Sequence, residues 1–109
     1  MRDLSVLEQL ILAAIIALDD EAYSMAIRKK VHEIANKKIM YGTLYNVMDQ
    51  LLHKGYVTKS KGELIPERRG RRRMYYKPTT KGMEALLKAH NLHEAIWANL
   101  QKLVRSHRK

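Results

Sequence analysis

The stretch Arg68-Arg69-Gly70-Arg71-Arg72-Arg73-Met74-Tyr75-Tyr76-Lys77 decides how this chain is interpreted. Its five arginines surround one glycine, a residue that permits tight turns, and they lead into an aromatic strand pattern. This order predicts the tip and the second strand of a basic β-hairpin. A guanidinium is planar and weakly hydrated, so it suits phosphate oxygens and a narrow minor groove better than the ammonium of lysine does. The stretch therefore favours nucleic-acid contact over a solvated charged loop.

Positive charge is concentrated around this hairpin. The 109 residues carry a formal net charge of +10, but residues 28–82 hold fifteen lysines and arginines against four acidic residues. Residues 1–27 are acidic, with one basic residue against five acidic ones. Charge distributed in this way indicates a polyanionic partner rather than a general means of staying in solution. The length fits one domain with a modest core, so burial against a partner subunit would add stability.

Several classes of protein are excluded by what the sequence lacks. It has no cysteine, which rules out disulfides, thiolate zinc sites and cysteine catalysis, and its five histidines lack zinc-ligand spacing, so no metal site is predicted. It contains no glycine-rich phosphate loop, nucleophile elbow or HExxH motif, so we expect neither enzyme activity nor a cofactor. The apolar run from Val6 to Leu18 is too short to span a bilayer. We expect a cytoplasmic protein without membrane contact, associated with the nucleoid.

Hydrophobic periodicity predicts three helices before the hairpin. Ser5 and Glu8 form an S-x-x-E capping box that begins the first helix, which extends to about Leu18. The second helix spans roughly residues 24–35, and the third spans about residues 41–54 before Gly55 ends it. The residues expected in the core include Ile27, Val31 and Ile34 of the second helix and the methionines Met25, Met40, Met48 and Met83.

The hairpin and the last helix complete the chain. Strands are predicted at residues 56–60 and 73–77, with a long loop containing Gly62, Pro66 and Gly70 between them. Thr79 is expected to cap a final helix from about Thr80 to Arg105, whose apolar residues recur at the alternating spacing of a coiled-coil seam. The first helix is apolar nearly all round, so it also needs a second covering surface. We therefore predict a homodimer with the interface residues Leu10, Leu12, Ile16, Leu86, Ala89, His93, Ile96, Trp97, Leu100 and Leu103.

Three helices followed by a two-stranded hairpin is the order of a winged helix-turn-helix. The predicted fold is mainly α with a small β-hairpin: a winged-helix DNA-binding domain over residues 1–78 and a long C-terminal dimerisation helix over residues 79–109. In such a domain the third helix enters the major groove, where Asn46 and Gln50 can pair with adenine, and the wing contacts the backbone or the minor groove. The predicted DNA-binding residues are Lys38, Tyr41, Gly42, Thr43, Tyr45, Asn46, Gln50, Arg68, Arg69, Arg71, Arg72 and Arg73.

Five segments also resemble a known family over about residues 5–85: Leu7-Glu8-Gln9-Leu10-Ile11-Leu12, Asp20-Glu21-Ala22-Tyr23-Ser24, Gly42-Thr43-Leu44-Tyr45, Lys54-Gly55-Tyr56-Val57 and the wing from Gly70 to Thr79. They look like the PadR family of bacterial transcriptional regulators. The resemblance implies a homodimeric winged-helix regulator, usually a repressor, whose C-terminal helix builds the dimer, and the single short C-terminal helix looks like the small subfamily. Met74 and Pro78 depart from the family pattern, which usually has a basic residue and leucine there.

Two questions stay open at this stage. His93 and Trp97 lie four residues apart, and some members of the PadR family bind flat hydrophobic effectors with aromatic residues on this helix. A small planar aromatic or cationic ligand at His93 and Trp97 is therefore one hypothesis, and interface packing is the other, which we favour. For the whole protein, the alternative is a nonspecific basic nucleic-acid-binding or architectural protein acting on DNA or RNA. Such a protein would need the charge but neither a two-fold seam nor a polar recognition face.

Overall fold

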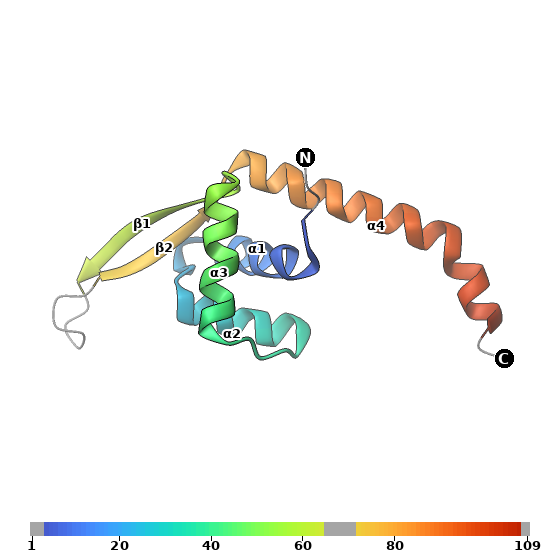
Figure 1. Ribbon diagram of the computed structural model, residues 1–109, viewed down its shortest axis with the longest axis horizontal. Helices are drawn as coiled ribbons and strands as arrows, with labels where there is room; N and C mark the ends of the chain where they lie inside the picture. Colours follow the sequence, from blue (N-terminus) through green and yellow to red (C-terminus); the bar gives the residue numbers. More distant parts are fainter. Residues whose placement is uncertain (1–3, 65–71, 108–109) are drawn as a thin grey trace.

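The computed structural model describes residues 4–64 and 72–107 of the chain (Figure 1). The elements in chain order are α1 (Val6–Leu18), the short 3-10 turn η1 (Asp19–Glu21), α2 (Ser24–Ala35), α3 (Tyr41–His53), β1 (Val57–Leu64), β2 (Arg72–Pro78) and α4 (Thr80–His107). The predicted fold class is confirmed, since three short helices precede a hairpin wing and a long C-terminal helix. Among the described helices, none combines the length and the apolar character that crossing a membrane requires.

The core lies where α1, α2 and α3 meet. Its largest fully buried side chains come from all three helices: Ile11, Leu12 and Ile15 from α1, Ile27 and Val31 from α2, and Leu44, Met48 and Leu51 from α3. Tyr56 and Tyr76 close the core on the side of the hairpin. Each helix buries one stripe at a spacing of three and four residues, as the sequence periodicity predicted.

The beginning of α1 is fixed to the end of α3 through Glu8. The predicted capping box is present, because the Glu8 backbone N–H donates to Ser5 Oγ at 3.1 Å and the Ser5 N–H donates to Glu8 Oε1 at 2.8 Å. The other carboxylate oxygen, Oε2, accepts from Lys54 Nζ at 2.5 Å, and Glu8 is only 3% exposed. Burial by itself raises the pKa of the Glu8 carboxyl. The hydrogen bonds from Lys54 and Ser5, together with the positive charge of Lys54, lower this pKa by a larger amount, so it lies below its ordinary value.

The hairpin is longer than predicted. β1 and β2 are antiparallel with Lys59 opposite Tyr76, and the pairing continues past Gly62, which was expected in the loop. A Cβ atom on Gly62 would lie 2.2 Å from the Tyr75 ring. The ring of Tyr75 on the opposite strand therefore packs directly over Gly62, where a larger residue would not fit. β2 ends at Pro78, one residue past the predicted end at Lys77. The Tyr76 N–H also donates to the Ala22 carbonyl at 2.9 Å, which joins the wing to the segment before α2.

A cluster of short contacts joins α4 to the winged-helix body. Thr79 Oγ1 accepts from the Gly82 N–H at 3.0 Å and donates to the Gly55 carbonyl at 2.7 Å, which confirms Thr79 as the cap. Gly82 is buried so closely that a Cβ atom would lie 2.1 Å from the Tyr56 carbonyl oxygen. Gly55 has a φ of +78°, a conformation that glycine adopts at the end of a helix with little strain.

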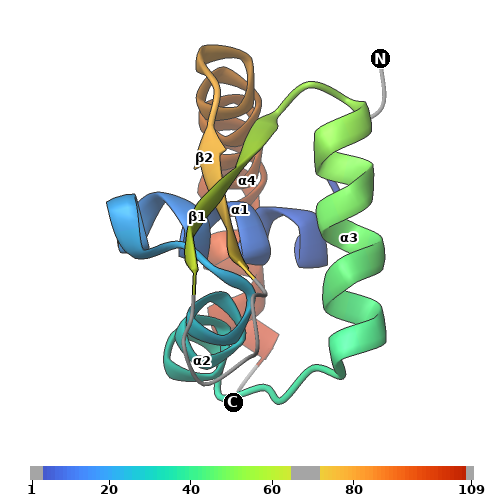
Figure 2. The same ribbon diagram turned by 90° about the vertical axis from the view of Figure 1, so that its left-hand side faces the viewer.

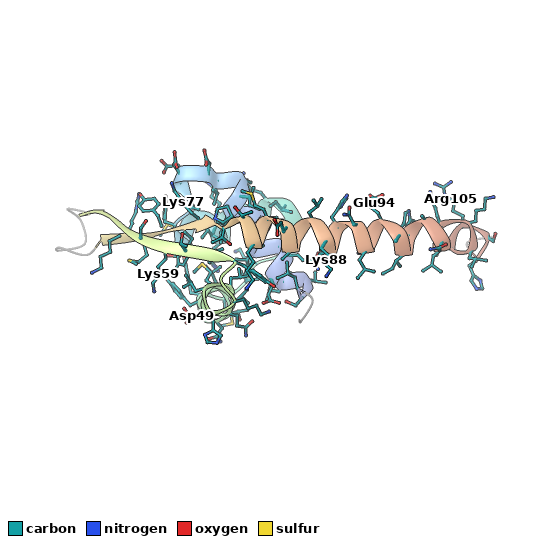
Figure 3. All side chains as sticks on the ribbon, turned by 90° about the horizontal axis from the view of Figure 1, so that it is seen from above. Asp49, Lys59, Lys77, Lys88, Glu94 and Arg105 are labelled. Atoms are coloured by element: carbon teal, nitrogen blue, oxygen red, sulfur yellow. The ribbon has the colours of Figure 1, made fainter. Side chains whose placement is uncertain are left out.

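Beyond its first turns, α4 leaves the body. Ala85, Leu86 and Ala89 are partly buried, whereas every residue from His90 to Leu100 is exposed. Figure 1 and Figure 3 show that α4 and the wing extend in opposite directions from the three-helix body, which gives the chain a length of 59 Å. The prediction of a long C-terminal helix is confirmed, and the helix extends to His107 rather than ending at Arg105.

Several burial predictions were wrong. Leu12, expected at a subunit interface, is completely buried inside its own chain, because α1 packs against both α2 and α3. Leu10 and Ile16 are partly buried against the same core. Ile34 lies in the last turn of α2, past the edge of the core, and is 51% exposed. Of the four methionines expected in the core, only Met48 is buried, and the three exposed ones are Met25, Met40 and Met83.

Candidate nucleic-acid interface

One side of α3 faces solvent and carries polar residues. Leu44, Val47, Met48 and Leu51 point into the core, so the opposite face is left free. The exposed residues of α3 are Tyr41, Gly42, Thr43, Tyr45, Asn46, Asp49, Gln50 and His53. Figure 2 shows α3 along one outer side of the molecule, and Asp49 points away from the body in Figure 3. A helix in this position can enter a major groove, where Asn46 and Gln50 have the donors and acceptors that match adenine.

The first turn of α3 is held by aromatic contacts. The rings of Tyr41 and Tyr45 stack with centroids 6.3 Å apart, and the Arg28 guanidinium of α2 lies 4.6 Å from the centroid of Tyr41. The Tyr45 hydroxyl donates to Ser24 Oγ at 3.0 Å, so Tyr45 connects α3 to the start of α2. Tyr45 nevertheless stays 45% exposed.

Gly42 is the second residue of α3 and lies open to solvent. A Cβ atom added to it would meet no atom of the chain within 4 Å, and its φ is not in the left-handed region. Neither packing nor backbone conformation within the chain therefore requires glycine at this position, although glycine in a helix is less favourable than alanine. A surface of another molecule that comes close to this turn would account for the glycine, and the DNA contact of Gly42 stays a prediction.

Only part of the predicted arginine-rich wing can be compared with the structure. Arg68, Arg69 and Arg71 lie outside the described residues, and only the backbone of Arg72 is described, as the first residue of β2. The exposed Arg73 guanidinium lies 4.2 Å from the centroid of the Tyr23 ring, and the hydrogen bond of Tyr75 with its guanidinium raises the pKa of Arg73. Arg73 thus has partners within the chain, at the point where the wing meets the body.

Tyr76 links the wing to the recognition face. It is buried in the core, and burial raises the pKa of its hydroxyl, with a further contribution from the negative charge of Asp49 on α3. Lys59 and Lys77, which Figure 3 labels on the two strands, are both exposed, and because Lys59 pairs with Tyr76 and Lys77 pairs with Thr58, they lie on opposite faces of the hairpin. Lys77 also approaches Asp20 at 3.6 Å, but both side chains are so exposed that this pair adds little to stability. The described part of the wing therefore carries exposed lysines on both faces beside a polar recognition helix.

This arrangement of helices and wing matches one family. A family model described as the transcriptional regulator PadR-like family aligns with residues 11–88. The chain belongs to the PadR-like family. Membership confirms the resemblance that the sequence motifs indicated, and it makes the protein a DNA-binding transcriptional regulator rather than an enzyme.

Solved structures of similar proteins agree with the PadR-like assignment. A PadR-like transcription factor from Bacteroides fragilis is 30% identical over 92% of this chain and 87% of that chain, with a TM-score of 0.64. A transcriptional regulator from Clostridium thermocellum is 25% identical over 89% of this chain and 91% of that chain, with a TM-score of 0.71. A PadR family regulator from Clostridium difficile has the same fold, with 21% identity, coverage of 96% and 100%, and a TM-score of 0.68. No curated protein matches this chain.

Some exposed groups of this PadR-like chain were missed from the sequence. Asp49 and His53 share the exposed face with Asn46, but their types did not suggest base contact. Arg28 was not among the predicted DNA-binding residues, whereas the structure brings it to the start of α3. The distance between Arg28 and Tyr41 depends on the turn between the two helices, which hydrophobic periodicity does not determine. Within residues 4–64 and 72–107, no group of three or more potential ligand side chains forms a metal site.

Proposed function

We propose that this PadR-like protein is a sequence-specific repressor that binds DNA as a homodimer. Each subunit would place α3 in a major groove, with Asn46 and Gln50 contacting base edges and Thr43 contacting the backbone. Binding at an operator would exclude the transcription machinery from the promoter, the usual action implied by the PadR resemblance. A regulator of this kind acts on chromosomal DNA, so we place it in the cytoplasm, associated with the nucleoid.

The observation that carries the dimer proposal is the apolar stripe of α4. Its first part, with Leu86 and Ala89, packs against the body of its own chain. The same helical face continues past the body with Ile96 at 48%, Leu100 at 43% and Leu103 at 64% exposure. A second copy is the occupant that fits, because a two-fold axis beside α4 would cover both stripes at once. The division into residues 1–78 and 79–109 would then separate the DNA-binding part from the part that pairs.

The dimer can be tested with charge placed on one face of α4 at a time. Ile96→Glu should convert the protein to a monomer, because a carboxylate would be buried in the seam without a partner. Leu87→Glu is the matched control, because residues 87 and 96 are nine positions apart, so their side chains lie on opposite sides of the helix. Light scattering after size-exclusion chromatography measures both masses. A dimeric Ile96→Glu variant would contradict the proposed interface.

Sequence specificity separates the proposal from its rival, a nonspecific basic binder of DNA or RNA. Selection of bound fragments from genomic DNA would first identify the operator. Affinities for that palindrome, for random duplex and for RNA are then compared at one salt concentration. We expect the palindrome to bind at least about a thousand times more tightly than random duplex. Equal affinities would support the nonspecific binder, which needs only charge.

We also propose that His93 and Trp97 offer a place for a small planar ligand between the subunits. Both side chains are exposed in the single chain, with Trp97 at 49%, and both lie on the half of α4 that extends beyond the body. A planar aromatic or cationic molecule could stack there and release the repressor, provided that it binds one spacing of the two α3 helices more tightly than another. Packing against the partner helix is the competing role for the two residues.

A further inference from the structure

A basic hollow lies beside the recognition helix, where α2 faces the turn that leads into α3. It has a volume of about 210 Å³ and is lined by Met25, Arg28, Lys29, His32, Lys38 and Tyr41. Three of the six lining residues carry a positive charge, one is a histidine, and the remaining two are apolar or aromatic. The hollow is smaller than the pockets that usually enclose a whole drug-sized molecule, so it suits one group that projects from a larger molecule.

Arg28 forms the fixed part of this hollow. Its Nε donates to the Ile39 carbonyl at 2.6 Å, and its guanidinium lies 4.6 Å from the centroid of the Tyr41 ring. These two contacts hold the guanidinium plane in place without using the terminal N–H groups. A guanidinium that is already oriented loses little side-chain entropy when it binds an oxyanion, and its planar donors match phosphate oxygens.

The other two cations of the hollow, Lys29 and Lys38, add their charges to this field. Lys29 and Lys38 are exposed, whereas the adjacent Lys30 is paired with Glu33 at 2.9 Å and does not line the hollow. Tyr41 is the first residue of α3, so the hollow lies beside a helix start, where unpaired backbone N–H groups also favour an anion. Met25 and Tyr41 give the same hollow an apolar wall.

We propose that this hollow binds a phosphate group of the DNA backbone, with the adjoining sugar against Met25 and Tyr41. The inference rests on the proposed function and deepens it, because it assigns a phosphate contact to residues of α2 that lie outside the base-reading face. Arg28 orients the phosphate, and Lys29 and Lys38 neutralise it. Register on the duplex then depends on α2 as well as on α3 and the wing. A phosphate of a free small molecule has the same chemistry, so it is the second source to be tested.

The test removes two charges from the hollow and two from elsewhere. The variant Lys29→Gln with Lys38→Gln keeps Arg28 and its contacts in place, and the control Lys88→Gln with Lys102→Gln makes the same change in net charge on exposed positions of α4. The affinities of the intact proteins for the operator and for random duplex are measured between 50 and 200 mM KCl. Losing one phosphate contact per subunit should lower the slope of log Kd against log salt by about 0.9, or about 1.8 in a dimer.

Raising the salt from 50 to 200 mM is a fourfold change, and four to the power 1.8 is about twelve. The affinity of the variant should therefore fall about twelvefold less over this range than the affinity of the wild type does. The loss should be equal for operator and random duplex, because a phosphate contact carries no sequence information. The control should keep the wild-type slope. A slope that is the same in the variant and the control overturns the DNA source.

Inorganic phosphate tests the second source. It replaces KCl at constant ionic strength while the backbone amide signals of residues 38–43 are followed by NMR. Saturable shifts in the wild type that vanish in the Lys29→Gln, Lys38→Gln variant support a free phosphate ligand. Unchanged slopes together with no phosphate shifts overturn the proposal, even if the wild type prefers its operator. If the wild type binds no duplex at all, the proposed regulator fails, and the phosphate titration alone decides whether the hollow binds phosphate.

Discussion

Replacing Gly42 by alanine should stabilise the free protein and weaken its DNA complex. The two effects have opposite signs because they depend on different surroundings. In the free chain the new methyl group would meet no atom within 4 Å, and the backbone at residue 42 does not need glycine. In the complex the same methyl group would lie on the turn of α3 that is proposed to come closest to DNA.

The stabilisation follows from the unfolded chain. Alanine at a helical position has less conformational freedom to lose than glycine, which is worth about 0.4–1 kcal/mol where no strain is introduced. For a protein of this size the midpoint of thermal unfolding should rise by roughly 2–5 °C. The measurement compares both proteins at one concentration, since unfolding of a dimer depends on concentration.

The loss of affinity follows from packing at the interface. A methyl group inserted into a close contact costs about 1–3 kcal/mol, which is roughly a 5- to 140-fold increase in Kd for each half-site. Titration of a fluorescent operator duplex measures this increase at fixed salt. A more stable Gly42→Ala variant with unchanged operator affinity would refute the reasoning, because the turn would then lie away from the DNA.

Gly82→Ala is the matched control for the sign of the effect. Its Cβ atom would lie 2.1 Å from the Tyr56 carbonyl oxygen, so the backbone of either α4 or the wing must move. We expect this variant to be destabilised by about 1–3 kcal/mol, opposite in sign to Gly42→Ala. The same substitution thus distinguishes a glycine needed by the fold from one needed by a partner.

Three further predictions concern bases, pH and ligand. Asn46→Ala should lower the ratio of operator to random-duplex affinity by about 5- to 100-fold without changing the slope of log Kd against log salt. The control Asn91→Ala on α4 should leave this ratio unchanged. Equal ratios in the two variants would show that Asn46 does not contact bases. The folded pKa of Glu8 lies below its ordinary value of 4.5, so the ionised carboxylate stabilises the fold above pH 4.5 and this stability is lost as the pH falls through the folded pKa. Between pH 6 and 3, the free energy of unfolding from chemical denaturation should therefore decline less steeply in Glu8→Gln than in the wild type. Parallel declines would contradict the role of the Glu8–Lys54 pair. Planar aromatic or cationic compounds should quench the fluorescence of Trp97, the only tryptophan in the sequence, and lower the affinity for the operator. Trp97→Ala should abolish this change in affinity while the protein remains a dimer. If Trp97→Ala is monomeric and no compound affects the wild type, Trp97 is a packing residue.

The helices could be predicted from the sequence because their signals are local. The capping box at Ser5, the stop at Gly55 and the cap at Thr79 each involve residues within a few positions of one another. The hairpin was less accurate at its far end, because Gly62 looked like a loop residue. Its actual role depends on Tyr75 of the opposite strand, which is thirteen positions away and contacts it only once the strands pair.

The candidate interface was predicted in part. The exposed face of α3 follows from periodicity, so Asn46 and Gln50 were found. The partners of Arg28 and Arg73 could not be found from the sequence. Arg28 packs on the ring of Tyr41 and Arg73 packs on the ring of Tyr23, and each of these tyrosines lies in another segment of the chain. Leu12 was assigned to the wrong surface for a related reason. A helix that is apolar nearly all round does not indicate which side its own chain covers.

The junction at Gly82 determines how far a small rotation is amplified. α4 has 28 residues and is about 42 Å long at 1.5 Å per residue, and it follows the wing after a single residue, Thr79. A tilt of about 5° at the junction would move the far end of the helix by about 4 Å over that length. Close packing of Gly82 on Tyr56 leaves no flexible joint to absorb such a tilt. The operators that a dimer of this protein can bridge would therefore be limited by the angle at one glycine, and a substitution there would select a different half-site spacing without altering any group that touches DNA.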